Sequence, residues 1–490
     1  MISNVKIVLI FFCIGTYIMA GAQQKTKPNI IYIYADDLGY GELGSYGQSK
    51  IKTPNLDQLA KEGIRFTQHY TGAPVCAPAR CMLMTGTHAG HSYIRGNYEL
   101  GGFEDKNEGG QMPLPEGTFT IAKMMKKAGY TTGMVGKWGL GMNNNSGNPT
   151  NQGFDYYYGY LDQKQAHNYY PSHLWENGHW DTLNNPSITV HRPIAKDAPD
   201  SAFNYYIGND FSLDKMGEKA LAFIKKNKDK SFFLYLPFTA PHLSLQAPAS
   251  EVNNYKGTLE EQPYYGEKGY APNKYPASTY ASLISILDKK VGMIMSLLKS
   301  LNLDENTLVM FSSDNGATFN VGGARTNYFN SNAGLRGYKQ DLYEGGIREP
   351  FIARWPGKIP AGQITNHISA QFDLMATLAD ITKTKAPKND GLSFLPVLLG
   401  NENAQQQHEY LYFEFPEKGG QVAIRMGSWK AVKSNLKKNP AAPWELYDLS
   451  VDEKEQNNIA TKHPDLINQF ESILKKEHKP AVIKEWEFVK

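Results

Sequence analysis

In the segment Asn29–Gly39, NIIYIYADDLG, the continuous apolar run Asn29–Ala35 is followed by two adjacent carboxylates, Asp36 and Asp37. Such an unbroken run is typical of a strand buried on both faces, since a half-exposed strand alternates apolar and polar residues. Helical patterns separate it from the other runs along the chain, and strands that alternate with helices predict a doubly wound, mostly parallel α/β sheet. The other three runs of this kind are Thr131–Val135, Ser231–Leu236 and Thr307–Ser312.

A second unit is predicted after residue 400, where the chain changes to short strands followed by one helix. This order indicates a small antiparallel α+β subdomain. We therefore expect a signal peptide at residues 1–22, a catalytic α/β domain at 23–400 and an α+β subdomain at 401–490. The predicted C-terminal elements are the strands His408–Phe415, Gln421–Met426, Lys430–Lys433 and Trp444–Leu449 and the helix Pro464–Lys476. The predicted helices of the larger domain are Asn55–Glu62, Thr120–Ala128 and Ala277–Leu301.

Composition excludes several classes of protein. With 41% hydrophobic and 20% charged residues, the 490-residue chain can bury a large core and is not disordered. The net charge is only +3 and no segment concentrates it, which gives no indication of a nucleic-acid or membrane-surface partner.

The N-terminus carries the pattern of an export signal. Lys6 precedes the apolar run Ile7–Met19, and Ala20-Gly21-Ala22 forms a small-residue cleavage site. The alternative, a membrane anchor, is disfavoured because the run is short for a span. Cys13 lacks the small residues that precede a lipidated cysteine. We expect export, with the periplasm as the default compartment and no stable membrane insertion.

Each predicted strand is followed directly by polar or ionisable side chains. In open α/β sheets ligands bind beyond the carboxyl ends of the strands, so these groups are expected to meet at one edge. Any one of them alone would more often be a solvated loop residue or a helix cap. The four strand ends carry Asp36-Asp37, Lys137-Trp138, His242 and Asp314-Asn315.

Four of these side chains supply hard oxygen ligands, the kind that Ca²⁺ or Mg²⁺ prefers, without the cysteine or histidine that zinc favours. They are Asp36, Asp37, Asp314 and Asn315.

The segment around Cys76 indicates a reactive helix start. Pro78 suits the first position of a helix, which places Cys76 at or beside the N-cap, where backbone N–H groups favour an anion. Arg80 lies four residues on, on the same helical face. The alternative is a buried, inert cysteine. Cys81 points away from this face, and we interpret it as a packing residue.

The sequence Cys76-Ala-Pro-Ala-Arg80-Cys-Met-Leu-Met-Thr85-Gly86 resembles the signature C-x-P-x-R-x-x-L-x-T-G of the sulfatase family, which belongs to the alkaline-phosphatase-like superfamily. The resemblance implies a large mixed, mostly parallel sheet sandwiched by helices. Other matching segments cover nearly all of the chain beyond the signal peptide. They are Asp36-Asp37-Leu-Gly39, Gly136-Lys137-Trp138, Pro241-His242, Ser313-Asp314-Asn315-Gly316, Leu335–Lys339, Glu344-Gly345-Gly346 and Glu445–Leu449.

The resemblance also implies a mechanism. In the family a maturation enzyme oxidises the cysteine to formylglycine, whose hydrate carries two hydroxyl groups. One attacks sulfur in line and displaces the alcohol; the other then loses its proton, expels sulfate and regenerates the aldehyde.

Each site residue takes a role by this resemblance. Arg80 would orient residue 76, and His242 would protonate the leaving oxygen. Lys137 and Lys339 would offset the charge on the sulfuryl oxygens. Ca²⁺ would be bound by Asp36, Asp37, Asp314, Asn315 and the modified Cys76.

The expected substrate is a sulfated glycan. Aromatic residues crowd a region that we interpret as a polar, turn-rich loop, where they either stack on sugar rings or pack over the sheet edge. We favour exo action on galactose- or N-acetylgalactosamine-type sugars. The aromatic residues are Tyr156, Tyr157, Tyr158, Tyr160, Tyr169, Tyr170, Trp175 and Trp180, with His167, His173 and His179 between them.

Two other functions remain open at this point. The first is a phosphate or phosphonate monoester hydrolase of the same superfamily. The second is a catalytically silent sugar-binding protein in which Cys76 stays a thiol.

The chain departs from the family pattern at one position. The family commonly reads G-K-W-H-L-G, and its histidine touches the formylglycine hydroxyl that is deprotonated, whereas this chain has Gly139 there. A nearby loop is expected to fill the space, and His167 is the candidate replacement base. The alternative is that His167 packs or contacts only the substrate.

Overall fold

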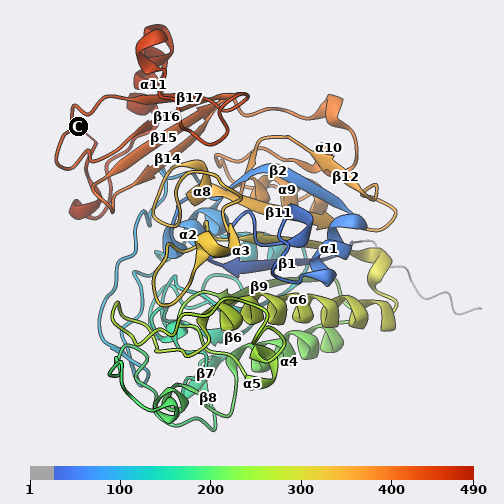
Figure 1. Ribbon diagram of the computed structural model, residues 1–490. Coiled ribbons are helices and arrows are strands. Elements are labelled where there is room, and N and C mark those ends of the chain that lie inside the picture. The colour runs from blue at the N-terminus through green and yellow to red at the C-terminus, as the bar shows by residue number, and fades with distance from the viewer. Residues whose placement is uncertain (1–26, 490) are drawn as a thin grey trace, which may run out of the picture.

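The computed structural model describes residues 27–489, so the predicted signal peptide at residues 1–22 lies outside the described residues. A sheet of 11 strands runs through the larger part of the molecule (Figure 1). Its strands are β1 (Asn29–Asp36), β2 (Ile64–Tyr70), β5 (Thr131–Lys137), β6 (Tyr156–Tyr160), β7 (His173–Glu176), β8 (His179–Thr182), β9 (Phe232–Pro241), β10 (Thr307–Ser313), β11 (Arg348–Arg354), β12 (Gln363–Thr365) and β13 (Ser369–Ala370).

The strand order confirms the predicted sheet. It runs β12-β2-β11-β10-β1-β9-β5-β6-β7-β8, with β13 also on β2. The four strands predicted from apolar runs, β10, β1, β9 and β5, are consecutive and parallel, and β6 continues them in parallel. The sheet is mixed because β11, β7 and β8 run antiparallel to their neighbours.

Helices cover both faces of the sheet, and β1 shows why its sequence is apolar throughout. Its alternate residues Ile31 and Ile33 face one hydrophobic cluster, and Ile30 and Tyr32 face the other. The first cluster includes α1 (Pro54–Lys61), α4 (Ser212–Lys226) and α6 (Pro276–Ser300); the second includes α2 (Cys76–Thr85), α3 (Ile121–Lys127) and α9 (Asp373–Thr382). Shorter helices are α5 (Ala249–Val252), α7 (Thr326–Phe329), α8 (Glu344–Ile347) and α10 (Leu395–Leu398).

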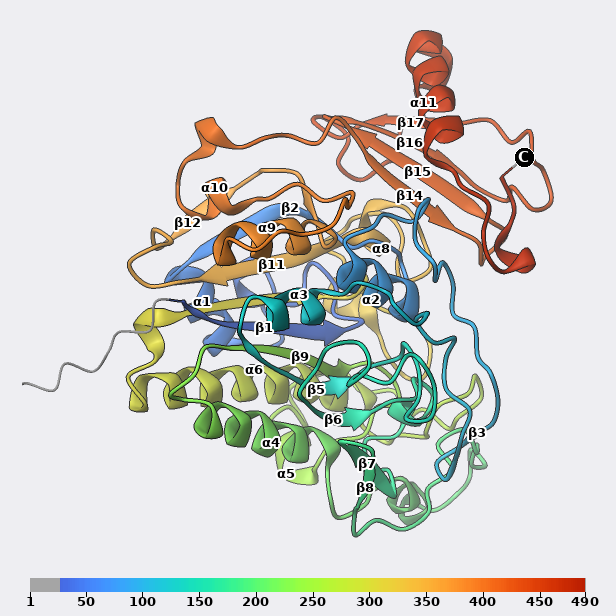
Figure 2. The same ribbon diagram turned by 180° about the vertical axis from the view of Figure 1, so that it is seen from behind.

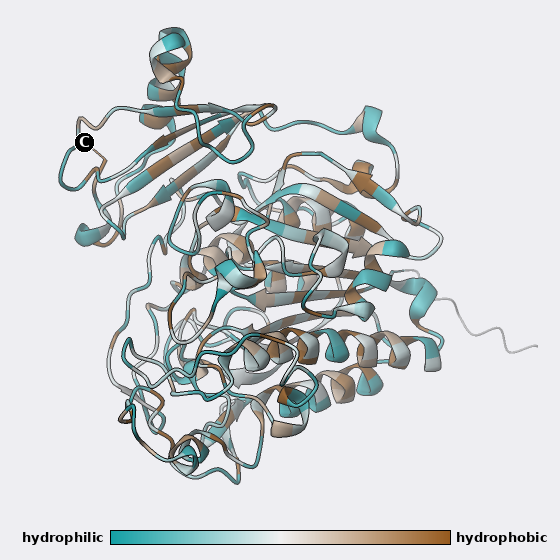
Figure 3. Cartoon of the chain, viewed as in Figure 1, coloured by the Kyte–Doolittle hydropathy of each residue, from teal (hydrophilic) through white to brown (hydrophobic). Residues whose placement is uncertain are grey.

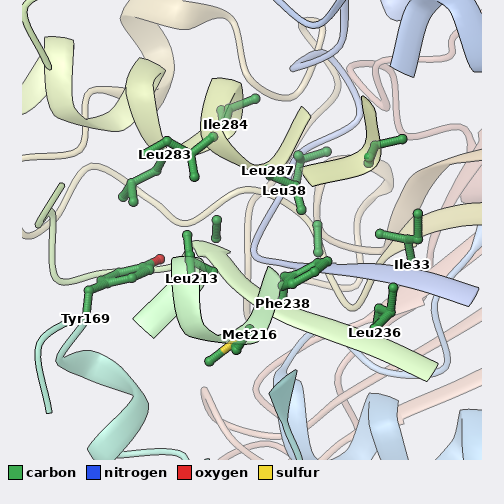
Figure 4. Packing of buried hydrophobic residues seen from close by; sticks show 14 of the residues in the cluster. Ile33, Leu38, Tyr169, Leu213, Met216, Leu236, Phe238, Leu283, Ile284 and Leu287 are labelled. Atoms are coloured by element: carbon green, nitrogen blue, oxygen red, sulfur yellow. The ribbon is translucent and has the colours of Figure 1, made fainter. Parts of the chain in front are cut away.

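Figure 4 shows the packing between α6 and the sheet, where Leu283 and Leu287 face Ile33 and Phe238. Burying each such side chain contributes about 1.5–3 kcal/mol. Hydrophobic colour accordingly concentrates on the central strands and on the helices against them (Figure 3).

The C-terminal part forms a separate four-stranded antiparallel sheet, as predicted, with one helix on its outer side (Figure 2). One face of this sheet packs on the helix through Phe470 and Ile473, and the other packs on the larger part through Leu342 and Ile347. The elements are β14 (Leu411–Phe415), β15 (Gln421–Met426), β16 (Trp429–Lys433), β17 (Glu445–Asp448) and α11 (Pro464–Glu477).

The prediction of a turn-rich loop in the aromatic region is wrong, since β6, β7 and β8 extend the sheet there. Strands β7 and β8 form a hairpin around Asn177-Gly178, whose φ angles of 47° and 91° suit the tight turn that this dipeptide favours. A two-strand hairpin, β3 (Phe103–Glu104) and β4 (Asn107–Glu108), precedes it in the chain. Among residues 27–489, no helix is both long and apolar enough to cross a bilayer.

Candidate active site

Strand register brings the predicted site residues to one edge of the sheet. Along β1, Ala35 pairs with Ser313 of β10, and Asp36 pairs with Pro241 of β9. Because these strands are parallel and in register, the residues that follow them emerge side by side. Those residues are Asp37, His242, Asp314 and Asn315, all of them buried.

The carboxylates form a compact acidic cluster. The backbone N–H of Asp37 donates to Asp314 Oδ1 at 3.0 Å, and Asn315 Nδ2 donates to Asp37 Oδ1 at 2.8 Å. Asn315 Oδ1 is buried and has no hydrogen-bond partner within the protein. One ligand atom from each of Asp36, Asp37, Cys76 and His242 lies within 4.8 Å of the others.

The charges of the cluster suit a bound cation. Burial and repulsion by Asp36 raise the pKa of Asp314. Burial alone would also raise the pKa of Asp36, but Lys137 and other neighbouring cations hold it well below its usual value. Since hard oxygen donors converge here and Asn315 Oδ1 is unpartnered, these residues fit a divalent ion such as Ca²⁺.

Cys76 begins helix α2 beside the acidic cluster. Val75 is the N-cap, so Cys76 lies beside it, as predicted. Pro78 occupies the third helical position and not the predicted first; its missing N–H costs nothing there, because the first intrahelical bond is donated by Ala79. Cys76 Sγ lies 3.4 Å from Asp36 Oδ1. Burial raises the pKa of the thiol, so the unmodified side chain is a poor nucleophile.

Three cations surround this cysteine and the carboxylates. Lys137 Nζ is 2.7 Å from Asp36 Oδ2, and Lys339 Nζ is 2.9 Å from Asp37 Oδ2 and 3.6 Å from Cys76 Sγ. Arg80 donates to Asp314 Oδ2 at 2.8 Å and to the Lys137 carbonyl at 2.6 Å. The predicted residues therefore meet, and each cation is held by a carboxylate.

His242 and His167 are stacked, with ring centroids 4.9 Å apart. His242 Nδ1 donates to the Leu243 carbonyl, which leaves Nε2 facing Lys339 Nζ at 3.2 Å and Asp37 Oδ2 at 3.5 Å. Burial lowers the pKa of His242 to about 4. The imidazole is consequently neutral near neutral pH in the absence of ligand.

The space at Gly139 is filled by Gln163, not by His167. A Cβ built on Gly139 would lie 2.8 Å from Gln163 Cγ, and the glycine has φ +73°. Gln163 is buried, and its Nε2 has no partner within the protein. The sequence interpretation therefore missed Gln163 as the residue that fills this space.

Other expectations about single side chains are resolved. Cys81 is a buried free cysteine in the cluster under α2, so its interpretation as a packing residue is confirmed. Most of the aromatic residues are buried under the sheet edge, including Tyr157, Tyr158 and Tyr169. Trp180 differs, with 48% of its surface exposed.

The C-terminal sheet holds the segment that carries Lys339. Gln421 Nε2 donates to the Gln340 carbonyl at 2.9 Å, and Arg336 donates to the Tyr447 hydroxyl at 2.8 Å. Lys430 of β16 is fully buried and lies 2.9 Å from Glu344 Oε1. The second sheet therefore positions one cation of the site.

Comparison with known proteins places this geometry in a family. The sulfatase family model matches residues 28–384, and a model described as N-sulphoglucosamine sulphohydrolase, C-terminal, matches residues 337–480. N-acetylgalactosamine-6-O-sulfatase of Bacteroides thetaiotaomicron is 30% identical, covering 92% of this chain and 93% of its own. Arylsulfatase A of Homo sapiens is 32% identical, covering 90% and 85%.

Solved structures agree with this placement. Ps i-CgsB in complex with k-i-k-neocarrahexaose has a TM-score of 0.75 at 28% identity, covering 92% of this chain and 94% of that one. The phosphonate monoester hydrolase of Agrobacterium radiobacter, with a TM-score of 0.60 at 19% identity, covering 92% and 95%, shares the fold. Since the sulfatase model spans more than half of the chain, including the acidic cluster and helix α2, this protein belongs to the sulfatase family.

Proposed function

We propose that the protein is an exported hydrolase that removes sulfate from sulfated carbohydrates, with formylglycine at position 76 and Ca²⁺ in the acidic cluster. The observation that carries this proposal is the position of Cys76, whose sulfur lies 3.4 Å from Asp36 Oδ1 and 3.6 Å from Lys339 Nζ. An atom at the position of this sulfur has the metal-binding carboxylate of Asp36 on one side and the ammonium group of Lys339 on the other.

The sugar specificity is supported by the relatives. One is named an N-acetylgalactosamine-6-O-sulfatase, and one solved neighbour contains a neocarrahexaose. We propose an exo-acting enzyme on galactose- or N-acetylgalactosamine-type sulfates. Export is supported by the sequence of residues 1–22.

The chain's own residues bind and orient the ester. Lys137 and Lys339 lie where ammonium groups offset the charge of the sulfuryl oxygens, and substrate binding draws them from Asp36 and Asp37. Arg80 positions Asp314 and the Lys137 backbone at once. Bound Ca²⁺ would act as a Lewis acid on a sulfate oxygen, held by Asp36, Asp37, Asp314 and Asn315. Formylglycine would supply the hydroxyl nucleophile that the buried thiol does not.

His242 is placed to move the proton. Its Nε2 faces Lys339 Nζ, which is next to Cys76, while Nδ1 is fixed by a hydrogen bond to the Leu243 carbonyl. A bound sulfate ester brings negative charge, which opposes the lowering of the His242 pKa by burial. His242 is thereby placed to donate a proton from Nε2 to the leaving alcohol oxygen.

A phosphate or phosphonate monoester hydrolase is the second candidate, favoured only by the shared fold of one such enzyme. Two metals or additional histidine ligands would support it. Around Cys76, the described residues provide a single cluster of ligands with one histidine.

Two measurements test the proposal. Mass spectrometry of the peptide that contains residue 76, from protein made in a host with the maturation enzyme, should show loss of the cysteine sulfur. The same protein should hydrolyse 4-nitrophenyl sulfate faster than 4-nitrophenyl phosphate. A retained thiol without sulfatase activity would support the silent sugar-binding protein, and faster phosphate turnover would support the second candidate.

A further inference from the structure

The segment Gln163–Asn168, which follows β6 and passes the active site, has unusual polar groups. Four of its buried side-chain atoms have no hydrogen-bond partner within the protein: Gln163 Nε2, Gln165 Oε1, His167 Nδ1 and Asn168 Nδ2. Leaving one such atom unpaired costs about 1–3 kcal/mol. Their concentration in one short segment indicates a surface that is completed by a ligand.

Protein contacts fix the orientation of the side-chain amides of Gln165 and Asn168. This orientation defines which of their atoms are available to a ligand. Gln165 Nε2 donates to Asp105 Oδ1 at 3.1 Å and to the His173 carbonyl at 3.2 Å, which leaves Oε1 as a free acceptor. Asn168 Oδ1 accepts from the Tyr170 N–H at 3.0 Å, which leaves Nδ2 as a free donor. A free acceptor and a free donor in the same short segment suit hydroxyl groups, which both donate and accept.

Both amides line a cavity of about 310 Å³, a size at the lower limit for small-molecule sites. Lys106, Lys164 and His191 also line it. Lys106 is exposed, and Lys164 pairs with Glu99. The cavity therefore offers hydroxyl-binding groups and a cation.

A row of rings connects this cavity with the nucleophile. The His191 ring lies 5.5 Å from that of His167, which is stacked on His242. His242 in turn is adjacent to Lys339 and thus to Cys76. A sugar whose sulfate reaches Cys76 would have its neighbouring unit directed along these rings.

We propose that this cavity is a second sugar subsite, which binds the unit next to the sulfated sugar and prefers a neighbour that carries a carboxylate or a second sulfate. Gln165 and Asn168 bind its hydroxyls, and Lys106 binds its anionic group. This inference rests on the proposed sulfatase function, because the sulfate fixes which end of the glycan enters.

The test compares substrates that differ only in the neighbouring unit. They are 4-nitrophenyl sulfate and four saccharides containing N-acetylgalactosamine 6-sulfate: the monosaccharide and its disaccharides with hexose, with hexuronate and with sulfated hexose. Asn168→Asp keeps the acceptor for Tyr170 and removes the free donor. Lys106→Ala removes the cation. Lys228→Ala is the matched control, since this exposed lysine precedes β9 at the opposite end of the strands.

Losing a hydrogen bond to a charged group costs about tenfold or more in affinity. We expect Lys106→Ala to lower kcat/KM for the anionic disaccharides about tenfold relative to the hexose disaccharide. Asn168→Asp should lower it about tenfold for all disaccharides relative to 4-nitrophenyl sulfate. Lys228→Ala should leave both ratios unchanged. Equal losses with hexuronate and sulfated hexose would mean that charge alone is recognised; a larger loss with one of them would identify the preferred anion.

Unchanged ratios in both site variants, with melting temperatures like that of the wild type, would overturn the subsite. Calorimetry that measures the binding of the disaccharides to Cys76→Ala protein distinguishes a failure of the subsite from a failure of the sulfatase function. If the wild type hydrolyses no sulfate but the disaccharide binds and Asn168→Asp weakens binding, the subsite stands and the function is wrong. Binding that neither variant changes would mean that water alone satisfies these amides, and would again overturn the subsite.

Discussion

The ammonium group of Lys339 lies 3.6 Å from the sulfur of Cys76, which is 263 residues earlier in the chain. Both residues lie in the larger unit, where Cys76 begins helix α2, but the segment that carries Lys339 is held in place by the second unit, the C-terminal sheet. The reaction site therefore depends on how these two units are joined, and not only on the strand ends.

Replacing Lys339 should strongly reduce catalysis. Lys339→Met keeps the length of the side chain but removes the charge opposite the sulfuryl group, and loss of one such group costs about 10²–10³ in kcat. Steady-state kinetics with 4-nitrophenyl sulfate measures this. Lys438→Met, at an exposed lysine of the C-terminal part, is the control. Activity of Lys339→Met within twofold of the control would contradict the assigned role.

Removal of the metal should abolish activity. Asp314→Ala deletes a buried carboxylate of the acidic cluster, so we expect the protein to lose its bound Ca²⁺ and its turnover together. Elemental analysis by mass spectrometry gives the metal content, and Asp229→Ala at an exposed acid is the control. The assignment fails if Asp314→Ala retains one Ca²⁺ per chain and full activity.

Restoring a histidine at position 139 should be harmful, although the family commonly has one there. Gly139 has φ +73°, and its Cβ position meets Gln163 Cγ at 2.8 Å. Overpacking typically costs about 1–3 kcal/mol. Gly139→His should therefore lower the free energy of unfolding by this amount, and Gln163→Ala should recover part of it in the double variant. Chemical denaturation of the four proteins measures the coupling; strictly additive effects would show that the two side chains do not compete.

His167 is expected to act in binding and not as the base that releases sulfate, because its ring is stacked on His242 and Gln163 occupies the space at Gly139. His167→Ala should raise KM more than it lowers kcat. Single-turnover kinetics distinguishes the roles: fast release of the alcohol followed by slow release of sulfate would restore the base hypothesis.

The stability of the protein should depend on pH through His408. Burial opposes a charge on this imidazole, but Asp373, 2.8 Å away, raises its pKa above the ordinary value. Because folding raises the pKa of His408, the ion pair contributes its full stability below the pKa of the unfolded state. This contribution is lost as pH rises through the pKa of the folded state. His408→Ala should thus cost about 1.5–3 kcal/mol near pH 5 and less near pH 9. Urea denaturation at the two pH values measures this; an equal cost at both would exclude the ion pair.

Much of the site could be predicted because it follows from local sequence plus one rule of topology. Asp36, Lys137, His242 and Asp314 each end an apolar run, and parallel strands bring such ends together. The rule could not place Gln163, Gln165 or Asn168, because their orientation depends on tertiary contacts such as that of Gln165 with Asp105. It also could not show which residue fills the space at Gly139.

The hairpin β7–β8 was missed for a different reason. Its aromatic residues were interpreted as part of a loop, and the Asn177-Gly178 turn signal was not used. Its antiparallel addition to a parallel sheet also has no counterpart in the alternating strand–helix pattern. The domain boundary at residue 400 stays a prediction, although the second sheet begins shortly after it.

If Cys76 is converted to formylglycine, as proposed, its burial sets the order of events in the biogenesis of the protein. Only 2% of its surface is exposed in the folded chain, beneath a lysine that the ribosome adds 263 residues later. An enzyme that oxidises this cysteine must therefore meet it as an extended segment, before the C-terminal half arrives and closes the fold. The yield of modified protein then depends on whether oxidation of Cys76 precedes folding, so that slower folding would favour the modified product.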